Sequence, residues 1–202
     1  MLIDGDAKAD RTFIFAHGAG GAMDAPFMNI VARGLAARGI RVARFEFPYM
    51  AARREGRRTG APDREPVLLA SWREAIAQLG IEDSVAIGGK SLGGRMASLI
   101  ADEQRVRALV CFGYPFHPPG QPERVRTKHL ASLATPALIL QGSRDPFGTA
   151  DDVAGYTLSR SIRIEWLTDG DHSFKPRAAS GMTLEQNLAK AIETAAEFIR
   201  QH

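Results

Sequence analysis

The chain has 202 residues, of which 45% are hydrophobic and 24% are charged, and its formal net charge is +3. This balance is ordinary for a soluble globular protein, and the length predicts one domain over residues 1–202. No apolar run approaches the roughly 18 residues of a membrane span, the start lacks the basic and apolar segments of a signal peptide, and the only cysteine, Cys111, cannot form an internal disulfide. We therefore expect a cytoplasmic protein without a membrane partner.

Short apolar runs predict six β-strands, at residues 12–16, 40–45, 84–87, 108–112, 136–141 and 162–167. Segments with helical spacing lie between them. The first of these helices is expected to have Asp24 as its cap, and the second to span residues 66–80. The last begins at Thr183, which has Gln186 at capping-box spacing. Because the strands are apolar throughout and alternate with helices, we predict an α/β fold, a doubly wound and mostly parallel six-stranded sheet with helices on both faces.

Two stretches, residues 46–65 and 113–130, show no hydrophobic period and are expected to be loops that cover the site. Within the first, residues 51–64 account for the whole positive excess of the chain, because they hold Arg53, Arg54, Arg57, Arg58 and Arg64 against only Glu55 and Asp63. Two interpretations are open: a solvated, salt-bridged loop, which we favour, or a pocket entrance that attracts an anionic substrate. No aromatic residue lies between these arginines, which disfavours a nucleic-acid partner.

The sequence Gly88-Gly89-Lys90-Ser91-Leu92-Gly93-Gly94 follows the third predicted strand and precedes a helical pattern. A G-x-S-x-G pattern between a strand and a helix is typical of a nucleophile elbow, a turn so sharp that the serine backbone is strained. We therefore predict that Ser91 is a nucleophile. Gly89 and Gly93 would keep neighbouring side chains clear of this turn.

A serine hydroxyl needs a base to take its proton, and the base needs a third group to fix its tautomer. His172 follows the sixth predicted strand and Asp145 follows the fifth, so both are expected at the carboxyl edge of the sheet with Ser91. The chain order serine, aspartate, histidine is the order of the α/β-hydrolase fold. Asp169 and Asp171 are alternative partners for the histidine, although a residue next to an imidazole in sequence rarely reaches it.

The negative charge that develops when a hydroxyl attacks an acyl carbon needs backbone N–H donors. One is expected at Leu92, where the helix dipole also favours negative charge. The other is expected in the glycine-rich stretch after the first strand, residues 17–21, at Ala19 or Gly18. His17 is interpreted as a packing residue of this loop.

Four motifs together carry a family resemblance: HGAGG, GGKSLGGR, QGSRDPFG and DGDHSF, each placed just after a predicted strand. The sequence from about residue 12 onward resembles the α/β-hydrolase superfamily, and more narrowly a compact group related to dienelactone hydrolases. This resemblance implies the same three residues, Ser91, Asp145 and His172. It also implies the strand order 2-1-3-4-5-6, which places the site where the winding reverses, between strands 1 and 3.

The sequence departs from that family in three ways. The eleven residues before Thr12 are too few for the two antiparallel strands with which such hydrolases usually begin, and there is no room for a cap domain. Dienelactone hydrolases have a cysteine where this chain has Ser91, so their substrate does not carry over.

Two other motifs fail on single residues. A phosphate-binding P-loop would need glycine at Ser84, and a dinucleotide fingerprint would need it at Met23. We therefore expect a serine hydrolase that cleaves an ester or related acyl bond of a small molecule, with no metal and no organic cofactor. The alternative is a catalytically silent binding or scaffold protein on the same fold. Candidate pocket walls are Tyr49, Met50, Tyr114, Phe116 and His117.

Overall fold

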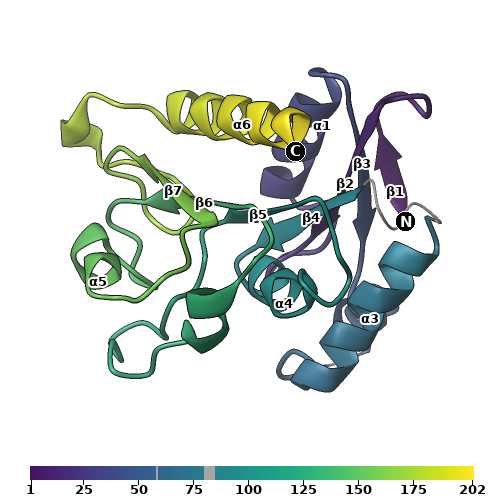
Figure 1. Ribbon diagram of the computed structural model, residues 1–202, viewed down its shortest axis with the longest axis horizontal. Coiled ribbons are helices and arrows are strands. Elements are labelled where there is room, and N and C mark those ends of the chain that lie inside the picture. The colour runs from purple at the N-terminus through teal and green to yellow at the C-terminus, as the bar shows by residue number, and fades with distance from the viewer. Residues whose placement is uncertain (58, 80–84) are drawn as a thin grey trace.

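The computed structural model describes residues 1–57, 59–79 and 85–202. Within these ranges, one sheet has the strand order β1-β3-β2-β4-β5-β6-β7 (Figure 1). β1 pairs antiparallel with β3, and the other neighbouring pairs are parallel. The strands are β1 (Leu2–Asp4), β2 (Arg11–Ala16), β3 (Ile40–Phe45), β4 (Val85–Lys90), β5 (Ala108–Phe112), β6 (Ala137–Gly142) and β7 (Ile162–Leu167). The expected loop arginine Arg58, helix end Gly80 and strand residue Ser84 lie outside the described residues.

The six predicted strands are β2 to β7, and their order is the predicted 2-1-3-4-5-6. The structure adds β1, a seventh strand that the sequence does not predict. Its three residues pair with Val42–Arg44 at the edge of the sheet. An ion pair fixes this short strand, because the nearly buried Arg44 guanidinium lies 2.6 Å from a carboxylate oxygen of Asp4.

Helices cover both faces of the sheet, as predicted (Figure 1). In β2, Phe13 and Phe15 contribute to one cluster of buried apolar side chains and Ile14 to the other, because successive side chains of a strand point to opposite faces. Burial on both faces is why the strands are apolar throughout. α1 (Pro26–Ala36) and α6 (Leu184–Gln201) cover one face, and α3 (Glu65–Ala77) and α4 (Leu92–Ile100) cover the other.

Of the two helix N-caps predicted from the sequence, one is confirmed and one is wrong. The Thr183 hydroxyl accepts the N–H of Gln186 and the Gln186 side chain accepts the N–H of Thr183, which confirms the capping box of α6. The expected cap Asp24 is wrong: α1 starts after Ala25 without a side-chain cap, because the Asp24 carboxylate binds Arg54 instead.

The stretch 46–65 is not a loop throughout, because residues Pro48–Arg54 form the short helix α2. Proline at its first position fits a helix start, and its two turns are too short to display a hydrophobic period. In the second irregular stretch, a 3-10 helix begins at Lys128 and ends at Ser132. Two further short elements lie near the C-terminal part of the sheet, α5 (Ala150–Ala154) and a 3-10 helix at Ala178–Ser180.

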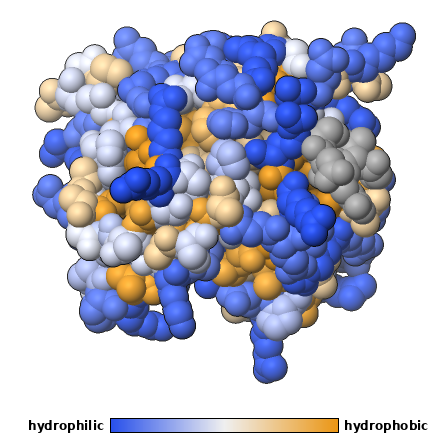
Figure 2. All heavy atoms as spheres, in the orientation of Figure 1, coloured by the Kyte–Doolittle hydropathy of each residue, from blue (hydrophilic) through white to orange (hydrophobic). Residues whose placement is uncertain are grey.

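The face drawn in Figure 2 is mostly hydrophilic, with separate small hydrophobic areas between the charged side chains. Such scattered apolar surface is normal for a folded protein. Within the described ranges, none of the helices combines the length and the apolar character that crossing a membrane requires.

Candidate active site

Ser91 lies in the sharp turn between β4 and α4, with φ 50° and ψ −113°. A positive φ is strained for a residue with a side chain, as the elbow pattern predicts. The close packing of this turn explains its glycines. A Cβ at Gly93 would lie 2.6 Å from the carbonyl oxygens of Ala16 and His17, and one at Gly89 would lie 2.6 Å from that of Ala16.

The structure brings Ser91, His172 and Asp145 into one hydrogen-bonded chain. The Ser91 Oγ lies 2.9 Å from Nε2 of His172, and Nδ1 of the same ring lies 2.7 Å from Oδ2 of Asp145. With Nδ1 donating its proton to the carboxylate, Nε2 is left as an acceptor for the serine proton. This geometry allows the imidazole to act as a general base toward the hydroxyl.

Asp145 is fully buried, and three donors fix its carboxylate. Oδ2 accepts from His172 and from Nε2 of Gln141 at 3.0 Å, and Oδ1 accepts the backbone N–H of Phe147 at 2.9 Å. The two alternative aspartates have other partners. Asp171 Oδ1 accepts backbone N–H groups of its own loop, and Asp169 pairs with Arg144 and Arg177.

Burial lowers the pKa of the His172 imidazole below its ordinary value of 6.5. The hydrogen bond to Asp145 acts against this shift, whereas the positive charge of Lys90 adds to it. The ring also packs against Phe147, with 4.2 Å between the ring centroids. The imidazole is therefore held in place on one side by an aromatic ring and is neutral at lower pH than a free histidine.

The glycine-rich loop after β2 lies against Ser91, and buried side chains on its other side contact two of its carbonyl oxygens. The hydroxyl of Tyr49 donates toward the carbonyl oxygens of Gly18 and Ala19, at 3.2 and 3.3 Å. Nδ1 of the buried His17 lies 2.7 Å from the Gly18 carbonyl, and Nε2 accepts the N–H of Phe47. His17 is thus a packing residue, as expected from the sequence. Leu92 is the first residue of α4, where backbone N–H groups have no partner within the helix.

A cavity of about 350 Å³ opens beside Ser91. It is lined by Gly18, Ala19, Gly20, Gly21, Ala25, Phe27, Met28, Lys90, Ser91, Phe147, His172 and Ser173. Its walls therefore come from the glycine-rich loop, the start of α1 and the loops after β6 and β7. The stretches 46–65 and 113–130 do not line it, which corrects the expectation that they form its cover.

The five candidate pocket walls are accordingly corrected as well. Tyr49 lies beneath the glycine-rich loop, and it is buried with Met50, Tyr114 and Phe116 in the core between the sheet and the α3–α4 layer. His117 is buried too, with Nδ1 2.8 Å from the Pro118 carbonyl. Being apolar and close to a strand end does not decide whether a side chain turns into a cavity or into the core.

Three arginines of the basic stretch, Arg53, Arg54 and Arg57, have partners other than a ligand. Arg54 binds the carboxylates of both Asp24 and Glu46, Arg57 pairs with Glu55, and Arg53 donates to the hydroxyl of Thr59. None of them lines the cavity at Ser91. These contacts favour the salt-bridged loop over the anionic pocket entrance.

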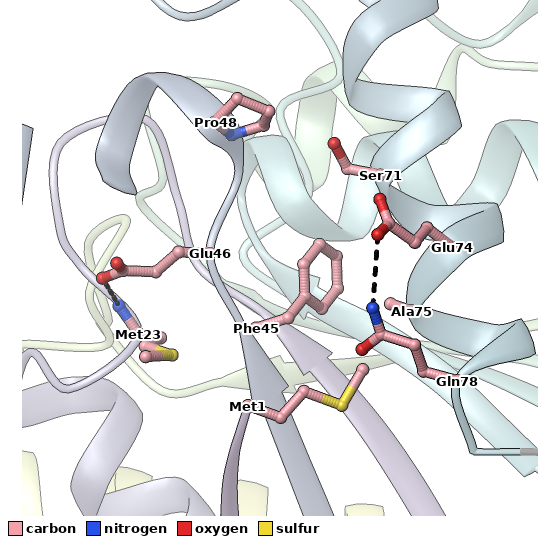
Figure 3. Close-up of a pocket in the computed structure, with 9 residues that line it drawn as sticks. All are labelled: Met1, Met23, Phe45, Glu46, Pro48, Ser71, Glu74, Ala75 and Gln78. Carbon is pink, nitrogen blue, oxygen red and sulfur yellow. Dashed lines mark hydrogen bonds between the residues drawn. The ribbon is translucent and has the colours of Figure 1, made fainter. Parts of the chain in front are cut away.

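A second cavity, of about 290 Å³, lies at the end of β3 next to α3 (Figure 3). Glu46 turns toward the backbone N–H of Met23 there, and Gln78 donates to Glu74. None of the described residues that line it is a histidine, and the Ser71 hydroxyl donates to the Val67 carbonyl at 3.0 Å. This cavity therefore holds no activated nucleophile.

Sequence reasoning missed six residues that line the Ser91 cavity: Ala25, Phe27, Met28, Lys90, Phe147 and Ser173. Lys90 lies in the elbow motif, one residue before Ser91, and Phe147 lies in the QGSRDPFG motif, two residues after Asp145. Phe27 and Met28 open the first helix after the glycine-rich loop. Proximity to the motifs was the available signal, but it does not show which neighbours face the cavity.

The sequence model of a known family, described as an alpha/beta hydrolase domain, matches residues 9–200. The chain belongs to this family. The match covers nearly the whole chain, and it agrees with the sheet order and with the resemblance read from the four motifs. In the described residues of this α/β hydrolase, no group of three or more His, Cys, Asp or Glu side chains could hold a metal ion.

Solved structures share the α/β-hydrolase fold. A dienelactone hydrolase from Anabaena variabilis is 21% identical with a TM-score of 0.72, over 99% of this chain and 90% of that one. An alpha-beta serine hydrolase homologue from Coxiella burnetii is 20% identical with a TM-score of 0.68, over 99% and 89%. A monoacylglycerol lipase from Paleococcus ferrophilus is 13% identical with a TM-score of 0.72, over 98% of each chain. At these identities the likeness shows the fold alone.

Proposed function

We propose that this α/β hydrolase is a serine hydrolase that cleaves an ester or a related acyl bond of a small molecule. The observation that carries the proposal is the hydrogen-bonded chain from the Ser91 hydroxyl through His172 to Asp145, at 2.9 and 2.7 Å. The names of similar structures agree with it, since they include an esterase domain and a lipase.

The reaction would pass through an acyl-enzyme. Ser91 Oγ attacks the acyl carbon while its proton moves to Nε2 of His172, which then protonates the leaving group. Water next gives a proton to His172 and attacks the ester carbon, and the acid leaves as Ser91 regains its proton. Asp145 stabilises the imidazolium in both steps. The N–H of Leu92 and that of Ala19 or Gly18 would stabilise the oxyanion, each by about 3 kcal/mol.

The cavity suggests the size of the acyl group. Its volume of about 350 Å³ is near the lower end of small-molecule sites, which begin at about 300 Å³. Phe27, Met28 and Phe147 give it an apolar wall. We therefore propose that the substrates are esters, or related acyl compounds, whose acyl group is short and apolar.

A fluorophosphonate probe tests the nucleophile directly, because it forms a stable adduct only with an activated serine. Intact-mass analysis should show one adduct on the wild-type protein and none on Ser91→Ala. An unlabelled wild-type protein that is folded by circular dichroism would contradict the proposal and favour the catalytically silent binding protein instead.

The acid limb of the pH profile should lie below pH 6.5. Only the neutral imidazole can accept the serine proton, and burial lowers the pKa of His172, so this form persists to lower pH than in a free histidine. In kcat/KM measured from pH 4 to 9 on a short-chain ester, activity should rise to half its plateau at a pH below about 6.5. A midpoint above that value, with the protein folded throughout, would contradict the role of His172.

A further inference from the structure

Lys90 is a nearly buried lysine next to the nucleophile, and the triad chemistry gives it no role. It is the last residue of β4 and is only 9% exposed. Its Nζ donates to the backbone carbonyl of His172 at 2.6 Å. One hydrogen bond thus joins the residue before the nucleophile to the main chain of the base.

The surroundings of this ammonium group are shaped to hold it. Nζ lies 5.6 Å from the centre of the Phe27 ring, a favourable position for a cation. Gly113, just after β5, leaves the necessary space, since a Cβ there would lie 2.8 Å from Nζ and 3.0 Å from the His172 carbonyl oxygen. The charges of Asp145 and Asp171 act on the ammonium from the loops after β6 and β7.

Burying a charge is costly unless it is paired and hydrogen-bonded. An apolar side chain of similar length, such as methionine, would fill the same space at the end of β4 without that cost. The two carboxylates compensate for part of the cost, but they do not require the lysine to reach the histidine carbonyl. The contact with the His172 main chain therefore indicates a role in the site rather than in packing.

We propose that Lys90 is a positioning residue, whose ammonium group fixes the loop of His172 relative to the strand that carries Ser91. This inference rests on the proposed function. Because the bond runs between the immediate neighbour of Ser91 and the backbone of His172, a shift of the His172 main chain away from Ser91 would stretch it. The ammonium also places a positive charge beside the imidazole, in opposition to Asp145.

The protonation state of Lys90 gives this role a pH signature. Burial lowers the pKa of Lys90 to about 8, although Asp145 and Asp171 act in the opposite direction. A neutral amine forms a weaker hydrogen bond than an ammonium. The wild-type enzyme should therefore lose part of its activity as the pH rises through about 8, and should settle at a lower alkaline plateau rather than at zero.

Lys90→Met should lower kcat by about 100-fold with little change in KM, because a displacement of about 1 Å in the reacting groups has an effect of this size. Its acid limb should move to higher pH, since the positive charge that lowers the pKa of His172 is gone. Its alkaline limb should disappear. Lys90→Arg keeps a charge that cannot be titrated away, so it should recover part of kcat and retain that activity above pH 8.

Lys175→Met is the matched control, because it removes one positive charge from an exposed position three residues after His172. Its kcat and both limbs should match the wild type. Wild-type kcat in Lys90→Met, a loss confined to KM, or an alkaline limb that persists in Lys90→Arg would each overturn the inference. If Lys90→Met does not fold, Lys90→Arg carries the test alone. Failure of the proposed function is separate, because it appears as a wild-type protein that the fluorophosphonate does not label.

Discussion

Alanine at Ser91 or at His172 should each reduce kcat by about a million-fold, and the double variant should be no slower than either single one. The hydroxyl is 2.9 Å from Nε2, so each group depends on the other: without the base the hydroxyl keeps its proton, and without the hydroxyl the base has nothing to activate. The loss is measured by single-turnover kinetics on a chromogenic acetate ester. The wild type and the variants are purified in parallel, so that contaminating esterases of the expression host can be excluded as the source of residual activity.

The chain offers a matched control for this experiment. The Ser98 hydroxyl lies 2.8 Å from Nε2 of His129, so a second serine–histidine pair exists in α4 and the segment after β5. Ser98 is buried, and its hydroxyl donates to the Arg95 carbonyl. In the part of the chain that the structure describes, no carboxylate forms a hydrogen bond with the ring of His129. Ser98→Ala should therefore keep wild-type kcat. Additive losses at Ser91 and His172 would mean that they do not act as a unit.

The sequence predicted the parts of this fold that depend on short local patterns. The elbow could be predicted because the strain at Ser91 requires glycines at fixed offsets. The strand order, in contrast, came from the resemblance to the α/β-hydrolase superfamily, and the structure confirms it for β2 to β7. His172 and Asp145 could be placed together for the same reason, since each follows its own strand.

The cavity walls could not be predicted in this way, because they depend on the direction of side chains after the strands end. Tyr114 follows β5 as closely as Asp145 follows β6, yet its ring packs against Phe116 in the core. Likewise, the burial of Lys90 depends on the space left by Gly113, a residue from a different strand end. Contacts of this kind, between side chains from distant segments, produce no periodic pattern in a single sequence.

Asp145→Asn should lower kcat by about ten-thousand-fold while leaving the fold intact. Each oxygen of the native carboxylate faces a donor: Oδ1 faces the N–H of Phe147, and Oδ2 faces both Gln141 and His172. An asparagine must turn its NH2 group toward one of these two sides. The backbone N–H of Phe147 cannot become an acceptor, whereas the imidazole can by changing its tautomer.

The asparagine NH2 group should therefore face His172 and donate to Nδ1, which moves the ring proton to Nε2. That nitrogen can then no longer accept the proton of Ser91, so the base is lost although every side chain is still in place. Asp171→Asn is the control, because its Oδ1 accepts backbone N–H groups and an amide oxygen can do the same. It should keep most of its activity. If Asp171→Asn instead lost activity and Asp145→Asn did not, the orienting carboxylate would be Asp171, and the 2.7 Å contact between His172 and Asp145 would be a packing contact only.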